Sequence, residues 1–99
     1  MIELYGLRFD WNGDKNLINI EKHGIPFREA ATVFADDEAV MLDDEGHSQG
    51  EERFIIIGLS ENLRLLMVCH CYREGGSVIR IISARKANNA EEKIYGGAK

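Results

Sequence analysis

Three cationic side chains lie in one apolar run near the C-terminus of this 99-residue sequence. The run Arg80-Ile81-Ile82-Ser83-Ala84-Arg85-Lys86 has the composition and length of a strand. Strict alternation places Arg80 and Ile82 on one face and Arg85 on the other. A guanidinium group inside a sheet loses hydration, so it needs an anionic partner. That partner could be a carboxylate of the chain or a bound phosphate, and the two outcomes imply different functions.

The preceding predicted strand, Leu65 to Tyr72, contributes two further polar groups. One side of this strand is uniformly apolar or thiol, and includes Met67 and Cys69, so we assign that side to the core. His70 and Tyr72 then lie on the opposite, open face of the sheet. We therefore expect one shallow cationic face, made by Arg53, His70, Tyr72, Arg80, Arg85 and Lys86.

Such a face suits cleavage of RNA without a metal ion. The 2′-hydroxyl attacks the adjacent phosphorus, so an enzyme must help to deprotonate that hydroxyl, stabilise the phosphorane and protonate the leaving oxygen. The planar fork of arginine pairs with two phosphate oxygens, and histidine carries protons near neutral pH. The candidate catalytic residues are Arg53, His70, Arg80, Arg85 and Lys86.

Structural roles explain the same side chains without any chemistry. Arg80 could pair with a carboxylate from the acidic loop, and His70 could be a hydrogen-bonded residue of the sheet. Tyr72 could be a packing residue, and Arg85 with Lys86 could be a hydrated strand end that helps to position the last helix. The sequence leaves these alternatives open.

The elements expected around these residues follow the order β-α-α-β-β-β-β-α. This order predicts a single α+β domain over residues 1–99, with an antiparallel sheet and helices packed on one face. The segments are a strand at Tyr5 to Trp11; a helix at Lys15 to Lys22; a helix opened by Ile25-Pro26, with an apolar stripe at 27, 30, 31 and 34; strands at Ala39 to Leu42, Phe54 to Leu59, Leu65 to Tyr72 and Val78 to Arg85; and a last helix capped by Asn88 or Asn89.

Charge is distributed unevenly along the chain, whose net charge is −5. Residues 1–50 hold four Lys or Arg against eleven Asp or Glu, whereas residues 51–99 hold eight against six. The acidic total argues against a general polyanion binder. A local positive cleft on an acidic body could hold one phosphodiester, but not a long nucleic acid, because affinity follows the number of phosphates neutralised.

No cofactor or metal ion is expected from the cysteine and carboxylate spacing. Cys69 and Cys71 are two residues apart on one strand, where a disulfide would be strained, so we expect reduced thiols. The acidic loop, Asp43 to Glu52, lacks the ligand spacing of an EF-hand. No apolar run reaches the length of a membrane span, and the N-terminus does not resemble a secretion signal. The expected location is the cytoplasm, without membrane contact.

Several segments together resemble the BrnT family of bacterial toxins, small ribonucleases of type II toxin–antitoxin systems with a RelE-like fold. The combination covers nearly the whole chain in the expected order, although no single motif is very specific. The resembling residues are Phe9-Asp10-Trp11, Asn16, Lys22-His23-Gly24, Phe27-Arg28-Glu29-Ala30-Ala31, Val33-Phe34, His47, Gly50-Glu51-Glu52-Arg53-Phe54, Ile57-Gly58, Arg80 to Ala87, Glu91 and Tyr95.

The resemblance implies RNA cleavage without a metal ion and a BrnA-like antitoxin. The ribbon-helix-helix part of that antitoxin would bind operator DNA, so DNA is expected only through the antitoxin, in a dimer or a 2:2 complex. RelE-like proteins use Arg and Lys on the sheet and near the C-terminal helix, a pattern that Arg53, Arg80, Arg85 and Lys86 match. His47 and Tyr95, with Tyr72, complete the candidates for substrate binding.

Two features depart from the family pattern. Pro26 stands where the family often has a Ser or Thr helix cap, and the chain is acidic whereas RelE-like toxins tend to be basic. The acidic charge favours a second hypothesis, a non-catalytic module that forms a complex with a DNA-binding repressor. A third hypothesis is a metal-dependent hydrolase built on the acidic loop.

Overall fold

Six strands form one sheet in the order β1-β2-β6-β5-β4-β3 in this computed structural model, which describes residues 1–47 and 50–97. The side chain of His47 also lies outside the described part. The predicted α+β class is confirmed. The elements are β1 (Ile2–Leu4), β2 (Leu7–Asp10), α1 (Gly13–His23), α2 (Phe27–Thr32), η1 (Val33–Ala35), β3 (Val40–Asp43), η2 (Glu45–His47), β4 (Phe54–Leu59), β5 (Leu65–Arg73), η3 (Glu74–Gly76), β6 (Val78–Lys86) and α3 (Asn89–Gly96).

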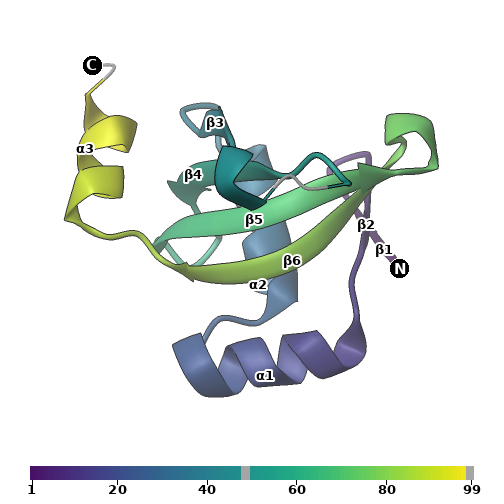
Figure 1. Ribbon diagram of the computed structural model, residues 1–99. Helices are drawn as coiled ribbons and strands as arrows, with labels where there is room; N and C mark the ends of the chain where they lie inside the picture. The colour runs from purple at the N-terminus through teal and green to yellow at the C-terminus, as the bar shows by residue number, and fades with distance from the viewer. Residues whose placement is uncertain (48–49, 98–99) are drawn as a thin grey trace.

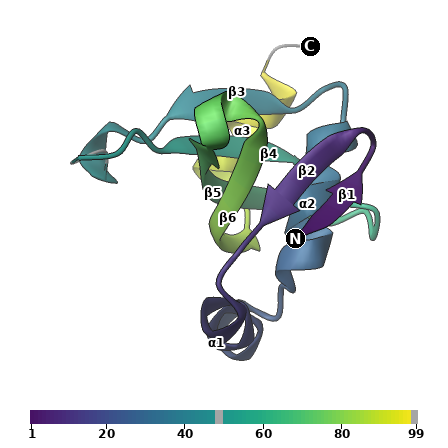
Figure 2. The same ribbon diagram turned by 90° about the vertical axis from the view of Figure 1, so that its right-hand side faces the viewer.

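The strand predicted at Tyr5 to Trp11 is present in shorter form as β2, and it forms a hairpin with β1, which was not predicted, at one edge of the sheet (Figure 2). Tyr5 and Gly6 join β1 to β2 with positive φ angles of 56° and 77°, as a tight two-residue hairpin turn requires. β2 then pairs with β6 in parallel. The sheet is therefore mixed, and the expectation of a wholly antiparallel sheet is wrong at this one pair.

Helices α1 and α2 cover one face of the sheet, while α3 lies apart from them beyond the strand ends (Figure 1). Asn12 caps α1 by accepting a hydrogen bond from the backbone N–H of Lys15 at 3.0 Å, and Gly24 ends the helix with φ 71°. The predicted apolar stripe of α2 is confirmed, because Phe27, Ala30 and Ala31 are fully buried. No helix in the described ranges is long and apolar enough to cross a membrane.

Helix α1 directs a polar side chain, Asn19, into the protein. Asn19 donates to the carbonyl oxygens of Ile25 and Ala84, each at 2.8 Å, and accepts from the Ala84 N–H at 3.1 Å. These bonds connect α1 with the end of β6, where the strand leaves the sheet. The large apolar residues of α1 are largely exposed, namely Leu17, Ile18 and Ile20.

The side of β5 that faces the core is the opposite of the one predicted. Leu66, Val68 and His70 are fully buried on the face that the helices cover. The His70 ring packs edge-on against Phe34, with 4.9 Å between ring centroids, and lies 6.1 Å from Phe54. This aromatic packing forms part of the core. Met67 and Cys69 therefore occupy the open face that the sequence had assigned to His70.

Candidate active site

A β-bulge in β6 determines which cations share the helix-free face. Cys69 pairs with Ser83, but the next residue, His70, pairs with Ile81, so Ile82 is an extra residue in the ladder. Beyond the bulge the alternation is shifted by one residue. Arg80 and Arg85 therefore lie on the same face, whereas strict alternation had separated them.

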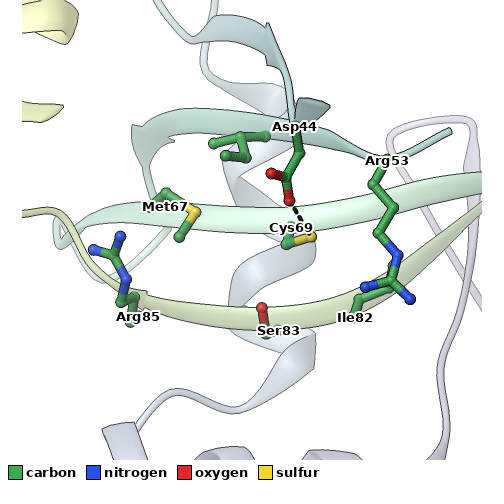
Figure 3. Close-up of a pocket in the computed structure, with 8 residues that line it drawn as sticks. Asp44, Arg53, Met67, Cys69, Ile82, Ser83 and Arg85 are labelled. Atoms are coloured by element: carbon green, nitrogen blue, oxygen red, sulfur yellow. Dashed lines mark hydrogen bonds between the residues drawn. The ribbon is translucent and has the colours of Figure 1, made fainter. Parts of the chain in front are cut away.

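A pocket of about 380 Å³ opens on this face. Arg85 and Arg53 lie at its opposite ends, and Asp44 and Cys69 lie between them (Figure 3). The floor is largely apolar, and Ser83 adds a hydroxyl group to it. The residues that line the pocket are Asp44, Arg53, Ile55, Met67, Cys69, Ile82, Ser83 and Arg85.

Helix α3 holds the guanidinium group of Arg85. Arg85 Nη1 and Nη2 donate to the two carboxylate oxygens of Glu91, each at 2.8 Å. Glu91 also completes a capping box, because its backbone N–H donates to Asn88 Oδ1 at 2.9 Å and its carboxylate accepts from the Asn88 N–H. The pair raises the pKa of Arg85 through hydrogen bonding with Glu91, which keeps this guanidinium group charged. The predicted helix cap thus also orients a pocket cation.

The guanidinium group of Arg80 pairs with an acid from the hairpin rather than from the acidic loop. Arg80 Nη1 donates to Asp10 Oδ2 at 2.7 Å, and both side chains are 30% exposed. Their backbones face each other across the parallel β2–β6 pair. Arg80 lies on the same face as the pocket but does not line it. Of the two partners considered from the sequence, a carboxylate of the chain or a bound phosphate, Arg80 therefore has the carboxylate.

Three residues expected on the cationic face do not lie there. His70 is fully buried under the helices, and burial lowers its pKa to about 4, so it is neutral at pH 7. Tyr72 shares the face of His70, with 5.5 Å between ring centroids. Lys86 pairs with the buried Leu66, so it also lies toward the helix side. The face assignment failed for these residues because it took the wrong side of β5 as the core.

The remaining predicted binding residues have different outcomes. The Tyr95 hydroxyl donates to Asp36 Oδ2 at 2.7 Å, away from the residues that line the pocket. Burial and Asp36 raise the pKa of Tyr95 to about 12. The side chain of His47 lies outside the described residues. The predicted role of Tyr95 and His47 in substrate binding stays a prediction.

Sequence reasoning missed Asp44 as a pocket residue. Its carboxylate oxygen Oδ2 accepts a hydrogen bond from the Cys69 thiol at 3.5 Å. Burial first, and Asp44 second, raise the pKa of Cys69 to about 11, so the thiol stays protonated. Both cysteines are free thiols, as expected. Asp44 could have been found by its place directly after β3, but only the fold shows that this strand end borders the pocket.

Comparison with known proteins identifies the family. A family model for the ribonuclease toxin BrnT of type II toxin–antitoxin systems matches residues 11–91. The chain belongs to this family. Its fold also matches a crystal structure of the Brucella abortus ribonuclease toxin BrnT, with a TM-score of 0.62 and 22% sequence identity over 84% of this chain and 99% of that chain. A search of curated proteins found no match.

Membership in the BrnT family confirms the resemblance seen in the sequence. The likeness to the Brucella abortus structure supports the α+β fold, with its helices and one mixed sheet. Because the family belongs to type II toxin–antitoxin systems, membership also implies an antitoxin partner. Among the described residues, no three or more His, Cys, Asp or Glu side chains gather where they could hold a metal ion.

Proposed function

We propose that this chain is an endoribonuclease toxin that cleaves RNA without a metal ion. The proposal rests on family membership together with one observation, the pocket with an arginine at each end on the helix-free face. Arg53 and Arg85 bind the phosphodiester and stabilise the charge of the phosphorane. Arg80 lies nearby on the same face and attracts the substrate, whereas His70 has no part in the chemistry. We expect this to occur in the cytoplasm, where the RNA is.

A substrate phosphate has to compete with Glu91 for Arg85. The Arg85 side chain is 34% exposed, so one side of the guanidinium group remains accessible to an incoming anion. The phosphate can add to this pair through the exposed edge, or it can displace the carboxylate. In either case the apolar floor of Ile55, Met67 and Ile82 excludes water beneath the reacting phosphate.

The direct test is cleavage of RNA by the purified protein, with and without a chelator. We expect cleavage that survives chelation and leaves 2′,3′-cyclic phosphate ends. Replacing Arg85 or Arg53 by Ala should lower the rate by a factor of about 10²–10³, as for other preorganised donors. Arg28→Ala is the matched control, because Arg28 of α2 pairs with Glu61 and lies outside the pocket. Wild-type cleavage no faster than that of Arg85→Ala would contradict the proposal.

We further propose that the antitoxin is BrnA-like, with a ribbon-helix-helix part that binds operator DNA. This part of the proposal rests on family membership alone. Expression of the chain with a neighbouring short gene should relieve toxicity, and the two proteins should co-purify as a 2:2 complex. Toxicity that the neighbour does not relieve would contradict the assignment of the partner.

The ion pairs favour a second candidate function. Arg80 and Arg85 are both neutralised within the chain, by Asp10 and Glu91. A non-catalytic module that binds a DNA-binding repressor needs no accessible cation. This candidate predicts complex formation with the partner, without toxicity and without RNA cleavage in the same assays.

A further inference from the structure

The pocket needs a group that accepts the proton of the attacking 2′-hydroxyl. Among the described residues that line it, four carry charge or titrate: Asp44, Arg53, Cys69 and Arg85. Arginine has no acceptor and stays protonated. The thiol of Cys69 keeps its proton at neutral pH, because burial and Asp44 raise its pKa to about 11. Of these four side chains, only the Asp44 carboxylate offers an acceptor oxygen to an attacking hydroxyl group without first losing a proton.

The backbone and the thiol together position the Asp44 carboxylate. The Asp44 N–H donates to the carbonyl oxygen of Arg53 at 2.9 Å, which ties the end of β3 to the start of β4. The carboxylate points toward the pocket floor and accepts from Cys69 Sγ at 3.5 Å (Figure 3). It therefore lies between the two pocket arginines, where a bound phosphodiester would place its neighbouring ribose.

Other proton carriers in the described chain are directed elsewhere. His70 is fully buried on the opposite face of the sheet. Tyr95 donates to Asp36, and its pKa, raised to about 12, keeps its hydroxyl group protonated at neutral pH, so it is not available as a base. Glu91 is occupied by Arg85 and by the cap of α3. Among the described residues that line the pocket with Asp44, the other charged or titratable groups are the Cys69 thiol of β5, Arg53 before β4 and Arg85 of β6, which pairs with Glu91 of α3.

We propose that the Asp44 carboxylate is the general base of the reaction, an inference that rests on the ribonuclease function proposed above. Asp44 accepts the proton of the 2′-hydroxyl while the 2′-oxygen forms a bond to phosphorus. The bond from phosphorus to the 5′-oxygen breaks, and that oxygen keeps the electron pair and takes a proton from water. The resulting hydroxide is neutralised by the proton that Asp44 releases. The products are a 2′,3′-cyclic phosphate and a 5′-hydroxyl.

The arginines and the carboxylate have complementary tasks in this arrangement. A carboxylate alone would repel the phosphate, but Arg53 and Arg85 at the two ends of the pocket offset that repulsion. The thiol hydrogen bond to Oδ2 fixes the plane of the carboxylate, and the carboxylate then faces the ribose. General-base catalysis of this kind contributes a factor of about 10²–10⁴ to the rate.

Asp44→Asn tests the proposal, and Asp43→Asn is the matched control. Asn preserves the shape of the side chain but cannot act as a base. Asp43, one residue earlier, pairs with Phe54 and is exposed outside the pocket, so its substitution removes the same charge. We expect Asp44→Asn to lower the single-turnover cleavage rate by about 10²–10⁴, and Asp43→Asn to leave it within about twofold of wild type.

Two further measurements separate a base from a structural or substrate-binding residue. Asp44→Asn should bind a non-cleavable 2′-deoxy oligonucleotide at least as tightly as wild type, because it removes a repulsive charge. The pH profile of the cleavage rate should differ between wild type and Asp44→Asn, because only wild type carries a carboxyl group at this position. Asp44→Glu, which keeps a carboxylate, should recover part of the rate.

The outcomes distinguish this inference from the function on which it rests. If wild type does not cleave RNA, the proposed function fails and the inference fails with it. If wild type cleaves RNA and Asp44→Asn cleaves equally fast, the inference alone is overturned. It is also overturned if the loss of rate matches a loss of oligonucleotide affinity, or if folded Asp44→Glu is as inactive as Asp44→Asn.

Discussion

His70 is enclosed by aromatic rings, and its imidazole makes little use of its polar atoms. Nδ1 lies 3.4 Å from the Val68 carbonyl oxygen, and Nε2 has no hydrogen-bond partner within the described chain. Burial lowers the pKa of His70 to about 4, because the charged form would lose its hydration. A residue that looks like a proton carrier in the sequence is therefore a neutral core residue, and its burial lowers the stability of the fold only at acid pH.

The stability of the fold should fall as the pH falls from about 6.5 to about 4. In this window the unfolded chain binds a proton at position 70 and the folded chain does not, so acid favours unfolding. The difference amounts to about 3 kcal/mol between pH 7 and pH 4. Urea unfolding of wild type and His70→Leu at several pH values measures it, with His23→Leu as the control for an exposed histidine.

Loss of the slope in His70→Leu, and its retention in His23→Leu, is the expected result. A second acid transition belongs to another residue. The hydrogen bond from Arg64 to the buried Glu29 lowers the pKa of Glu29 to about 2, so that carboxylate loses its stabilising contribution between about pH 4.5 and pH 2. A slope between pH 6.5 and pH 4 that persists in His70→Leu would contradict the assignment.

At the scale of elements, α3 controls how much of Arg85 is available to a ligand. Its capping box and its pair with Arg85 share one carboxylate, that of Glu91. Tyr95, on the next turns of the helix, joins α3 to Asp36 at 2.7 Å. Because α3 has no fully buried residue, these polar contacts account for much of its attachment to the sheet.

Replacing Glu91 by Gln should strengthen the binding of a non-cleavable RNA analogue. The substitution frees Arg85 from a paired carboxylate, and a partly exposed pair of this kind is worth about 1 kcal/mol, or about fivefold in affinity. Asn88→Ala is the control, because it removes the cap at a cost of about 1 kcal/mol but leaves the pair between Arg85 and Glu91 intact. Titration of a fluorescent 2′-deoxy oligonucleotide measures both. Equal affinities for Glu91→Gln and wild type would show that Glu91 does not compete with the phosphate.

At the scale of the whole molecule, an acidic body presents a small cationic site. The net charge is −5, and many of the basic side chains are paired within the chain, as in Arg28–Glu61, Arg64–Glu29, Arg73–Glu51, Arg80–Asp10 and Arg85–Glu91. A surface of this kind cannot neutralise a long run of phosphates. The protein therefore has to recognise RNA through a few contacts rather than through general attraction.

The salt dependence of RNA binding should consequently be shallow. Phosphate contacts from Arg53 and Arg85, with a weaker attraction from Arg80 on the same face, predict a slope no steeper than about −2 for the logarithm of the binding constant against the logarithm of salt concentration. Filter binding of a 2′-deoxy oligonucleotide at several salt concentrations measures the slope. A value steeper than about −4 would indicate a wider cationic surface than the one formed by these residues.

Local patterns determined much of the fold. The spacing of apolar residues and turns located β4, β5, β6 and both N-terminal helices to within a few residues, and Asn12, Gly24 and Asn88 act at the helix ends as their types predict. These features depend on neighbours a few positions apart, so they can be derived from the chain alone. The family could also be recognised, because its residues recur in order along nearly the whole sequence.

Only the tertiary structure decided which side chains meet at the site. Alternation places His70 and Cys69 on opposite faces of the sheet. Packing of the His70 ring against Phe34 and Phe54 determines which of these faces belongs to the core. The extra residue in β6 then reverses the alternation, so Arg80 and Arg85 share a face that includes the pocket. The partners of charges are equally non-local, since Asp10 and Arg80 are 70 residues apart. A strand pattern has two equivalent faces, and only long-range packing and pairing distinguish them.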